Sequence, residues 1–255
     1  MDYKQREQAF QSFIYQCEKT KQYIGLGNPF ANILLIGQEP SGNEIARNIR
    51  DVKTCFENKD LDKLYRQPKR DENGNRFSAG HTWNKYQKLI NLVYNRECQE
   101  SDMTDFGEIA FVTDINNSVS KTKELTKDSA KVLESVRKRL LLFQQSEFIQ
   151  DFPVVVLACG DYIKNDDKTR QIDETFDVKF VGENREVKSK SGKSTFPFWL
   201  HYNDDKTRLV IHTRQLSGRI PNTLLEELAK VIKKHLEEHN KMALFLTPKE
   251  NIHNA

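Results

Sequence analysis

Two short polar segments of this 255-residue chain hold residue types that could do chemistry, and each follows an apolar run. The first segment, Gly37 to Glu44, contains two glycines and a proline, which make a tight and rigid turn. Such a turn presents Gln38 and Glu39 outward, and a carboxylate held there can orient and activate water. The alternative is that Glu39 is an exposed loop charge or a charge at the start of a helix.

The second segment runs from His212 to Arg219 and also follows an apolar run. A lone histidine at a strand end is more often structural than catalytic. Leu216 stands among arginine, glutamine and serine, where an isolated leucine is uncommon. It could simply pin the loop to the core.

Apolar patterning predicts the elements that position these segments. Four short runs are typical of buried strands, namely 32–37, 109–113, 152–158 and 208–212. Helical spacing of apolar residues predicts helices over 10–17, 45–56, 83–93, 128–145 and from Asn222 onward. This alternation predicts an α/β fold with three α/β/α layers and a central, mostly parallel four-stranded sheet. Ligands of such folds bind at the carboxyl ends of the strands, where both polar segments begin.

Finer details of three segments also follow from the pattern. We expect Leu133 to face inward from helix 128–145 and Asn222 to be the N-cap of the last helix. The aromatic cluster from His81 to Tyr86 could line the pocket, or belong to the core with Thr82 as the cap of helix 83–93. Residues 161–200 could hold a hairpin or a lid. The basic and aromatic run from Arg185 to Trp199 resembles single-strand-binding surfaces, but we favour a hairpin whose aromatic residues join the core.

Composition sets broad limits on the protein. Its length fits a single domain, which we place at residues 1–240, followed by a polar C-terminal tail at 241–255. The net charge is only +3, from 40 basic and 37 acidic side chains, so charge alone gives little support for a nucleic-acid partner. The first residues are charged and the apolar runs are too short to span a membrane. Four scattered cysteines predict reduced thiols, no metal site and a cytoplasmic location.

The two polar segments together resemble a known family. Gly37-Gln38-Glu39-Pro40 resembles the G-Q-D-P-Y water-activating loop of uracil-DNA glycosylases, with Glu for Asp and Ser41 for Tyr. Residues 212–217 resemble the family's H-P-S-P-L-S loop and match it at His212, Leu216 and Ser217. Both motifs follow the first and the last core strand, as in that family. The resemblance covers about residues 31 to 220, but only these two loops are specific.

The resemblance implies roles for individual residues. Glu39 would position water and stabilise the cationic sugar, and His212 would donate a hydrogen bond to the base oxygen that becomes negative. Leu216 would wedge into the duplex. Residues that would bind the flipped base are Gly37, Gln38, Pro40, Ser41, Asn116 and Phe77, and those that would contact DNA are Arg214, Leu216, Ser217 and Arg219. Asp114 and Asn117 are alternatives to Asn116 as the base reader, and Phe56 is an alternative stacking aromatic.

The sequence departs from the family at points that affect specificity. Ser41 cannot exclude the thymine methyl group as the family's tyrosine does, and Glu39 is one methylene longer than aspartate. Thr213 and Arg214 replace proline and serine, which makes the second loop less rigid. The identity of the base therefore stays open.

The function expected from the resemblance is a DNA glycosylase of base excision repair, a monomeric, cofactor-free hydrolase acting on uracil or another damaged base in DNA. Two alternatives are an inactive nucleic-acid-binding protein of the same fold and a hydrolase of nucleosides or related small molecules.

Overall fold

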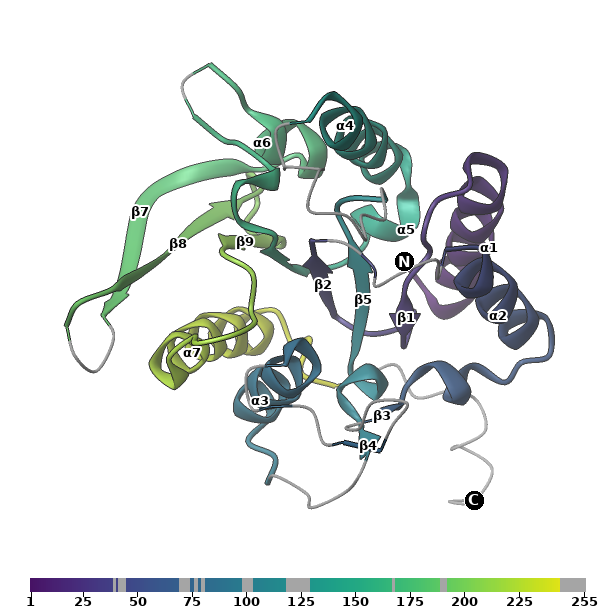
Figure 1. Ribbon diagram of the computed structural model, residues 1–255, viewed down its shortest axis with the longest axis horizontal. Helices are drawn as coiled ribbons and strands as arrows, with labels where there is room; N and C mark the ends of the chain where they lie inside the picture. The colour runs from purple at the N-terminus through teal and green to yellow at the C-terminus, as the bar shows by residue number, and fades with distance from the viewer. Residues whose placement is uncertain are drawn as a thin grey trace.

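The protein has an α/β fold in which helices cover both faces of a mixed sheet (Figure 1). The computed structural model describes residues 1–38, 40, 45–68, 74–75, 78, 81–97, 103–117, 129–166, 168–188 and 192–243. Its strands are β1 (Leu26–Gly27), β2 (Ile33–Gly37), β3 (Gln67–Pro68), β4 (Met103–Thr104), β5 (Ala110–Asp114), β6 (Val154–Ala158), β7 (Lys179–Lys188), β8 (Thr195–Tyr202) and β9 (Leu209–Thr213). Its α-helices are α1 (Tyr3–Thr20), α2 (Ile45–Glu57), α3 (Thr82–Tyr94), α4 (Ala130–Gln145), α5 (Glu147–Gln150), α6 (Gln171–Phe176) and α7 (Asn222–Glu238).

Seven of the described strands form one sheet, in the order β1-β5-β2-β6-β9-β8-β7. The four predicted strands are its centre, because β5, β2, β6 and β9 pair in parallel with one another in that order. β1 joins one edge of the sheet in antiparallel orientation, and β8 and β7 extend the other edge. The predicted four-stranded, mostly parallel sheet was therefore wrong in extent. Antiparallel edge strands escape a search for continuous apolar runs, because one face or one edge of such strands meets water.

Two hydrophobic cores fill the spaces between the sheet and its helices. One core packs α1, α2, α4, α5 and α6 on one face, where Phe10, Phe13, Phe111 and Phe148 meet as an aromatic cluster. The other core packs α3 and α7 side by side on the opposite face (Figure 1). All four central strands contribute to both cores, as alternating side chains of a doubly covered sheet must.

The helix ends follow local capping rules, with small departures from the predicted positions. Asp2 caps α1 because its side chain accepts the Gln5 N–H at 2.8 Å while the Gln5 side chain accepts the Asp2 N–H at 2.9 Å. The N-cap of α3 is His81 rather than Thr82, and that of α7 is Pro221 rather than Asn222. The inward position predicted for Leu133 was also wrong, because its side chain is 53% exposed.

β7 and β8 form a hairpin ribbon that extends beyond the carboxyl ends of the central strands. Residues 195–197 of β8 pair with β7 alone, because the pairing of β8 with β9 begins at Phe198 and Thr213. Figure 1 shows this ribbon projecting from the body of the molecule. Phe196 and Phe198 are buried, so two aromatic residues of the basic and aromatic run join the core. None of the helices in the described residues combines the length and the apolar character needed to cross a membrane.

Candidate functional site

The carboxyl ends of the four central strands lie side by side and form the carboxyl edge of the sheet, which is distinct from its outer strands β1 and β7. Gly37 at the end of β2 is paired with Asp114 at the end of β5, and Leu157 of β6 is paired with His212 of β9. The segments that follow these strands therefore emerge side by side. Both polar segments singled out in the sequence begin at this edge.

The ends of β2 and β9 are tied to consecutive backbone carbonyls at the end of β6. Gln38 donates from Nε2 to the Cys159 carbonyl at 3.3 Å, and His212 donates from Nε2 to the Gly160 carbonyl at 2.9 Å. Gly160 has a φ of +56°, a backbone conformation that glycine adopts without strain. The segment after β6 was not among the predicted site residues, yet it connects the two motifs.

The hydrogen bond to Gly160 defines the state of the His212 ring. A carbonyl oxygen can only accept, so Nε2 carries the proton. Burial lowers the pKa of His212 below its usual value, and the bond to Gly160 opposes this shift without reversing it. The imidazole is therefore neutral at pH 7. Its Nε2–H already has an acceptor, so donation to a substrate oxygen requires that oxygen to replace the Gly160 carbonyl.

Trp199 is an aromatic residue of this edge that the sequence analysis did not single out as a site residue. Its ring stacks on His212, with centroids 5.2 Å apart and planes 30° from parallel. The two residues are direct cross-strand partners in β8 and β9. Only the strand register brings them together, and no local pattern in the sequence reveals that register.

A carboxylate and a phenol lie close to Gly37. A Cβ atom at position 37 would overlap the Asp114 carboxylate and would lie 3.3 Å from the Tyr86 hydroxyl. Burial raises the pKa of the fully buried Tyr86, and the nearby Asp114 carboxylate raises it further, so the phenol stays protonated. Asp114 is partly exposed. Asp114 thus places a carboxylate beside the Gly37 backbone.

The asparagines after β5 take different positions. The backbone N–H of Asn116 donates to the Gln38 carbonyl at 2.9 Å, and Asn116 is only 1% exposed. Asn117 is a structural clamp, since its side chain accepts the Tyr23 N–H and donates to the Lys21 carbonyl. Of the two asparagines, Asn116 is therefore the one placed beside the first motif.

The second motif divides into exposed and buried residues. Arg214 and Arg219 are exposed, and the Arg214 guanidinium lies over the Phe196 ring at 5.2 Å. Ser217 is partly exposed. Leu216 is 0% exposed and belongs to the core shared with α3 and α7, so the expectation of a leucine wedge in DNA is not met in this structure. The alternative, a leucine that pins the loop, accounts for its position.

Replacing Leu216 with alanine is expected to lower the free energy of unfolding by about 2.5 kcal/mol, because it leaves a cavity in a packed core. Denaturant unfolding followed by circular dichroism measures this change. Leu133→Ala, at an exposed leucine, is the matched control and is expected to change stability by less than about 0.5 kcal/mol. If Leu216→Ala kept its stability but lost DNA binding, Leu216 would contact DNA instead of the core.

Several predicted site residues cannot be placed in this site. Glu39, Ser41 and Phe77 lie outside the described residues, whereas Pro40 is buried next to Gln38. Phe56 of α2 packs edge-on against Phe10 of α1 at 5.5 Å. It belongs to the helix layer, which argues against Phe56 as the stacking aromatic.

The described side chains provide neither a thiol nucleophile nor a metal centre at this edge. Cys17, Cys55 and Cys159 are free thiols, and burial raises the pKa of Cys159 so that it stays protonated. Within the described ranges, no three His, Cys, Asp or Glu side chains gather as metal ligands. Among the described residues, the groups placed at this edge include the Asp114 carboxylate, the neutral His212 imidazole, amides and backbone groups.

Comparison with known proteins does not assign this chain to a family. No protein-family model matches the sequence, and no curated protein matches it either.

Proposed function

We propose that this chain is a DNA glycosylase of the uracil-DNA glycosylase type, which hydrolyses the bond between a damaged base and its deoxyribose. One observation carries the proposal. Gln38 and His212, the amide and the imidazole of the two motifs, bind the consecutive carbonyls of Cys159 and Gly160. Motifs far apart in the sequence thus converge on one place at the carboxyl edge of the sheet, where α/β proteins bind ligands.

The arrangement of strands supports the same proposal. The two motifs follow β2 and β9, which are the first and last of the four parallel strands in chain order. The resemblance implies this placement of a water-activating loop and a base-contacting loop on a three-layer fold. The edge strands β1, β7 and β8 would be additions to that central unit.

In the proposed reaction, water attacks the anomeric carbon of the sugar while the base departs with the electrons of the N-glycosidic bond. A carboxylate stabilises the positive charge on the sugar and receives the proton of the water, the role that the resemblance gives to Glu39. The neutral His212 ring donates its Nε2–H to the base oxygen on which negative charge develops, in place of the Gly160 carbonyl. Stacking on Trp199 holds the plane of the His212 ring while its acceptor is exchanged.

Basic side chains near this edge suit the DNA backbone. Arg214 and Arg219 are exposed in the loop after β9, and Lys188 and Lys193 are exposed near the tip of the β7–β8 ribbon. Such groups position a protein on phosphates without reading sequence. The free thiols of Cys17, Cys55 and Cys159 fit the reducing cytoplasm, where we place the enzyme as a monomer.

Two observations favour a second candidate, a nucleic-acid-binding protein of the same type without turnover. The His212 donor is already engaged by Gly160, and Leu216 is buried instead of available as a wedge. Both features would reduce catalysis without preventing contacts of the loop arginines with phosphates.

Incubation with labelled oligonucleotides that carry uracil, hypoxanthine, xanthine or a thymine mismatch, followed by alkaline strand scission, tests the proposal. The native protein is expected to cut at uracil in single- or double-stranded DNA. Glu39→Ala and His212→Ala are each expected to reduce the rate at least about 100-fold, the usual effect of removing a group that stabilises transition-state charge. Glu227→Ala on α7 and His239→Ala at the C-cap of that helix are matched controls and should keep the native rate.

The outcomes separate the two candidates. Cleavage that all four variants retain equally would contradict the proposed roles of Glu39 and His212. No cleavage, with DNA binding that weakens steeply as salt increases, would favour the binding protein. The absence of both cleavage and binding would exclude both candidates.

A further inference from the structure

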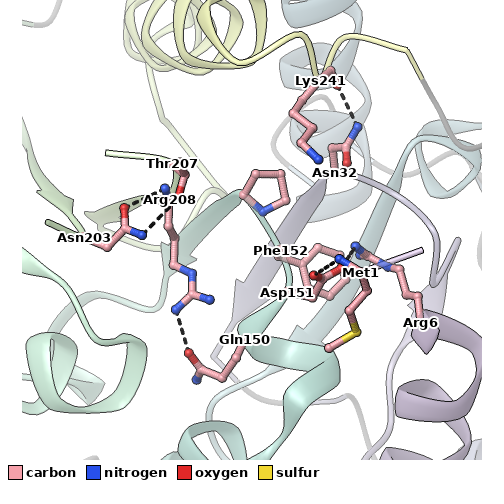
Figure 2. A pocket seen from close by; sticks show the side chains of 11 residues that line it. Met1, Arg6, Asn32, Gln150, Asp151, Phe152, Asn203, Thr207, Arg208 and Lys241 are labelled. Atoms are coloured by element: carbon pink, nitrogen blue, oxygen red, sulfur yellow. Dashed lines mark hydrogen bonds and ion pairs between the residues drawn. The ribbon is translucent and has the colours of Figure 1, made fainter. Parts of the chain in front are cut away.

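A polar cavity lies at the opposite edge of the sheet from the candidate functional site, near the amino ends of the strands (Figure 2). Asn32, Pro153 and Arg208 each directly precede one of the parallel strands β2, β6 and β9. The cavity has a volume of about 210 Å³, which is far more than a single water molecule needs. Its lining comes from six separate parts of the chain and consists of Met1, Arg6, Asn32, Gln150, Asp151, Phe152, Pro153, Asn203, Thr207, Arg208 and Lys241.

Positive charge predominates in this lining. Arg6, Arg208, Lys241 and the amino-terminal ammonium group are cationic, and Asp151 is the one carboxylate among the described lining residues. Asp151 is already bound on both oxygens, by Arg6 at 2.6 Å and by the ammonium group at 3.1 Å. It therefore does not balance Arg208 or Lys241.

Arg208 is partly buried and lacks a carboxylate in contact within the described structure. Its Nη1 donates to the Gln150 side chain and to the Phe176 carbonyl, both at 2.7 Å, and both acceptors are neutral. Burial lowers the pKa of Arg208, and the carboxylates Asp177, Asp151 and Asp205 oppose this only through space. A partly desolvated guanidinium with neutral partners is a ready site for an anion.

The backbone around the two cations is held in place. Asn32 donates from Nδ2 to the carbonyls of Lys241 and Ala243, at 2.7 and 3.1 Å, which fixes the segment after α7 over the cavity. The Asn203 side chain accepts the Arg208 N–H at 2.8 Å and fixes the turn before β9. Figure 2 shows the bond between Asn32 and Lys241 and the bond between Asn203 and Arg208 at two sides of the cavity. The side chains that would bind an anion therefore belong to backbone segments that hydrogen bonds hold in place.

We propose that this cavity binds a phosphate group, either as free phosphate or as a small phosphate monoester, between Arg208 and Lys241. In this site, Nε and Nη2 of the Arg208 guanidinium donate hydrogen bonds to the phosphate oxygens, and the Lys241 ammonium group supplies a second positive charge. The site is independent of the proposed glycosylase chemistry, because it lies at the other end of the strands.

Isothermal titration calorimetry at constant ionic strength tests this site with three probes: inorganic phosphate, uridine monophosphate and uridine. Saturable binding of either phosphate-bearing probe, without binding of uridine, is expected. Arg208→Gln and Lys241→Gln should each weaken phosphate binding at least about tenfold, as loss of a charge-assisted contact does. Lys206→Gln, an exposed cation of the same turn outside the cavity lining, should bind like the native protein.

Arg208→Gln and Lys241→Gln test the same site independently of each other. Lys241 is exposed, so its replacement tests the site even if Arg208→Gln fails to fold. Tighter binding of the monophosphate than of inorganic phosphate would identify a phosphate ester as the ligand, and equal binding would identify free phosphate. The proposal is overturned if neither phosphate-bearing probe binds the native protein, if uridine binds as well as its monophosphate, or if the folded variants bind phosphate as the native protein does.

Discussion

Replacing Arg139 with alanine is expected to lower the free energy of unfolding by about 4 kcal/mol, a large effect for a single side chain. Arg139 is 0% exposed in α4. Its guanidinium donates to the Asp114 carbonyl at 2.8 Å and to the Thr113 hydroxyl, and it lies 4.5 Å from the centre of the Phe143 ring. The alanine variant leaves these acceptors without a donor and also leaves a cavity.

Two further variants separate the causes. Arg139→Met keeps much of the volume but none of the donors, so we expect it to recover about half of the loss. Arg137→Ala removes an exposed arginine of the same helix, paired with Glu134, and should change stability by less than about 0.5 kcal/mol. Equal stability of Arg139→Ala and Arg137→Ala in urea titrations would contradict the structural role of Arg139.

Because Arg139 binds the end of β5, its effect should extend to the candidate site. Thr113 and Asp114 carry the strand into the segment that reaches Gln38 through Asn116. Loss of the guanidinium frees this strand end next to Gly37. A folded Arg139→Met protein is therefore a test of whether the strand end needs to be held for activity.

Acidification from pH 7.5 to pH 5.5 is expected to destabilise the protein. Burial lowers the pKa of His201, His212 and His235 below the unfolded value of about 6.5. Below pH 6.5 the unfolded chain therefore binds protons that the folded protein excludes, so stability falls as the pH decreases toward the folded pKa values. Each histidine contributes up to about 1.4 kcal/mol per pH unit in this window.

His201 illustrates the physical cause. Its Nδ1–H donates to Asp173 at 2.9 Å, while Nε2 is buried without a hydrogen-bond partner in the described structure. Protonation would place an unpaired N–H of a cation at that position, a cost that exceeds the attraction of Asp173.

Guanidinium titrations at several pH values measure the slope of stability against pH. His201→Gln and His235→Gln should each reduce the slope, because each removes a histidine whose pKa burial lowers. Stability that stays constant or increases between pH 6.5 and pH 5.5 would contradict the prediction.

The sequence by itself determined the elements that local pattern controls. The continuous apolar runs at 32–37, 109–113, 152–158 and 208–212 became the four parallel strands, because strands covered on both faces contain few polar residues. The apolar stripe of α1, from Phe10 to Cys17, is buried as predicted, because residues three and four apart share one face of a helix. The two polar segments at strand ends were also recognisable, since their glycines and prolines interrupt the pattern.

Tertiary structure decided what depends on register and on distant partners. The pairing of Trp199 with His212, the bonds of Gln38 and His212 to consecutive carbonyls, and the cavity around Arg208 join segments that no local window contains. The burial of Leu216 and Arg139 likewise follows from what packs around them rather than from residue type. Local propensity specifies the type and the approximate extent of an element, whereas the contacts that form a site arise only when the layers close over one another.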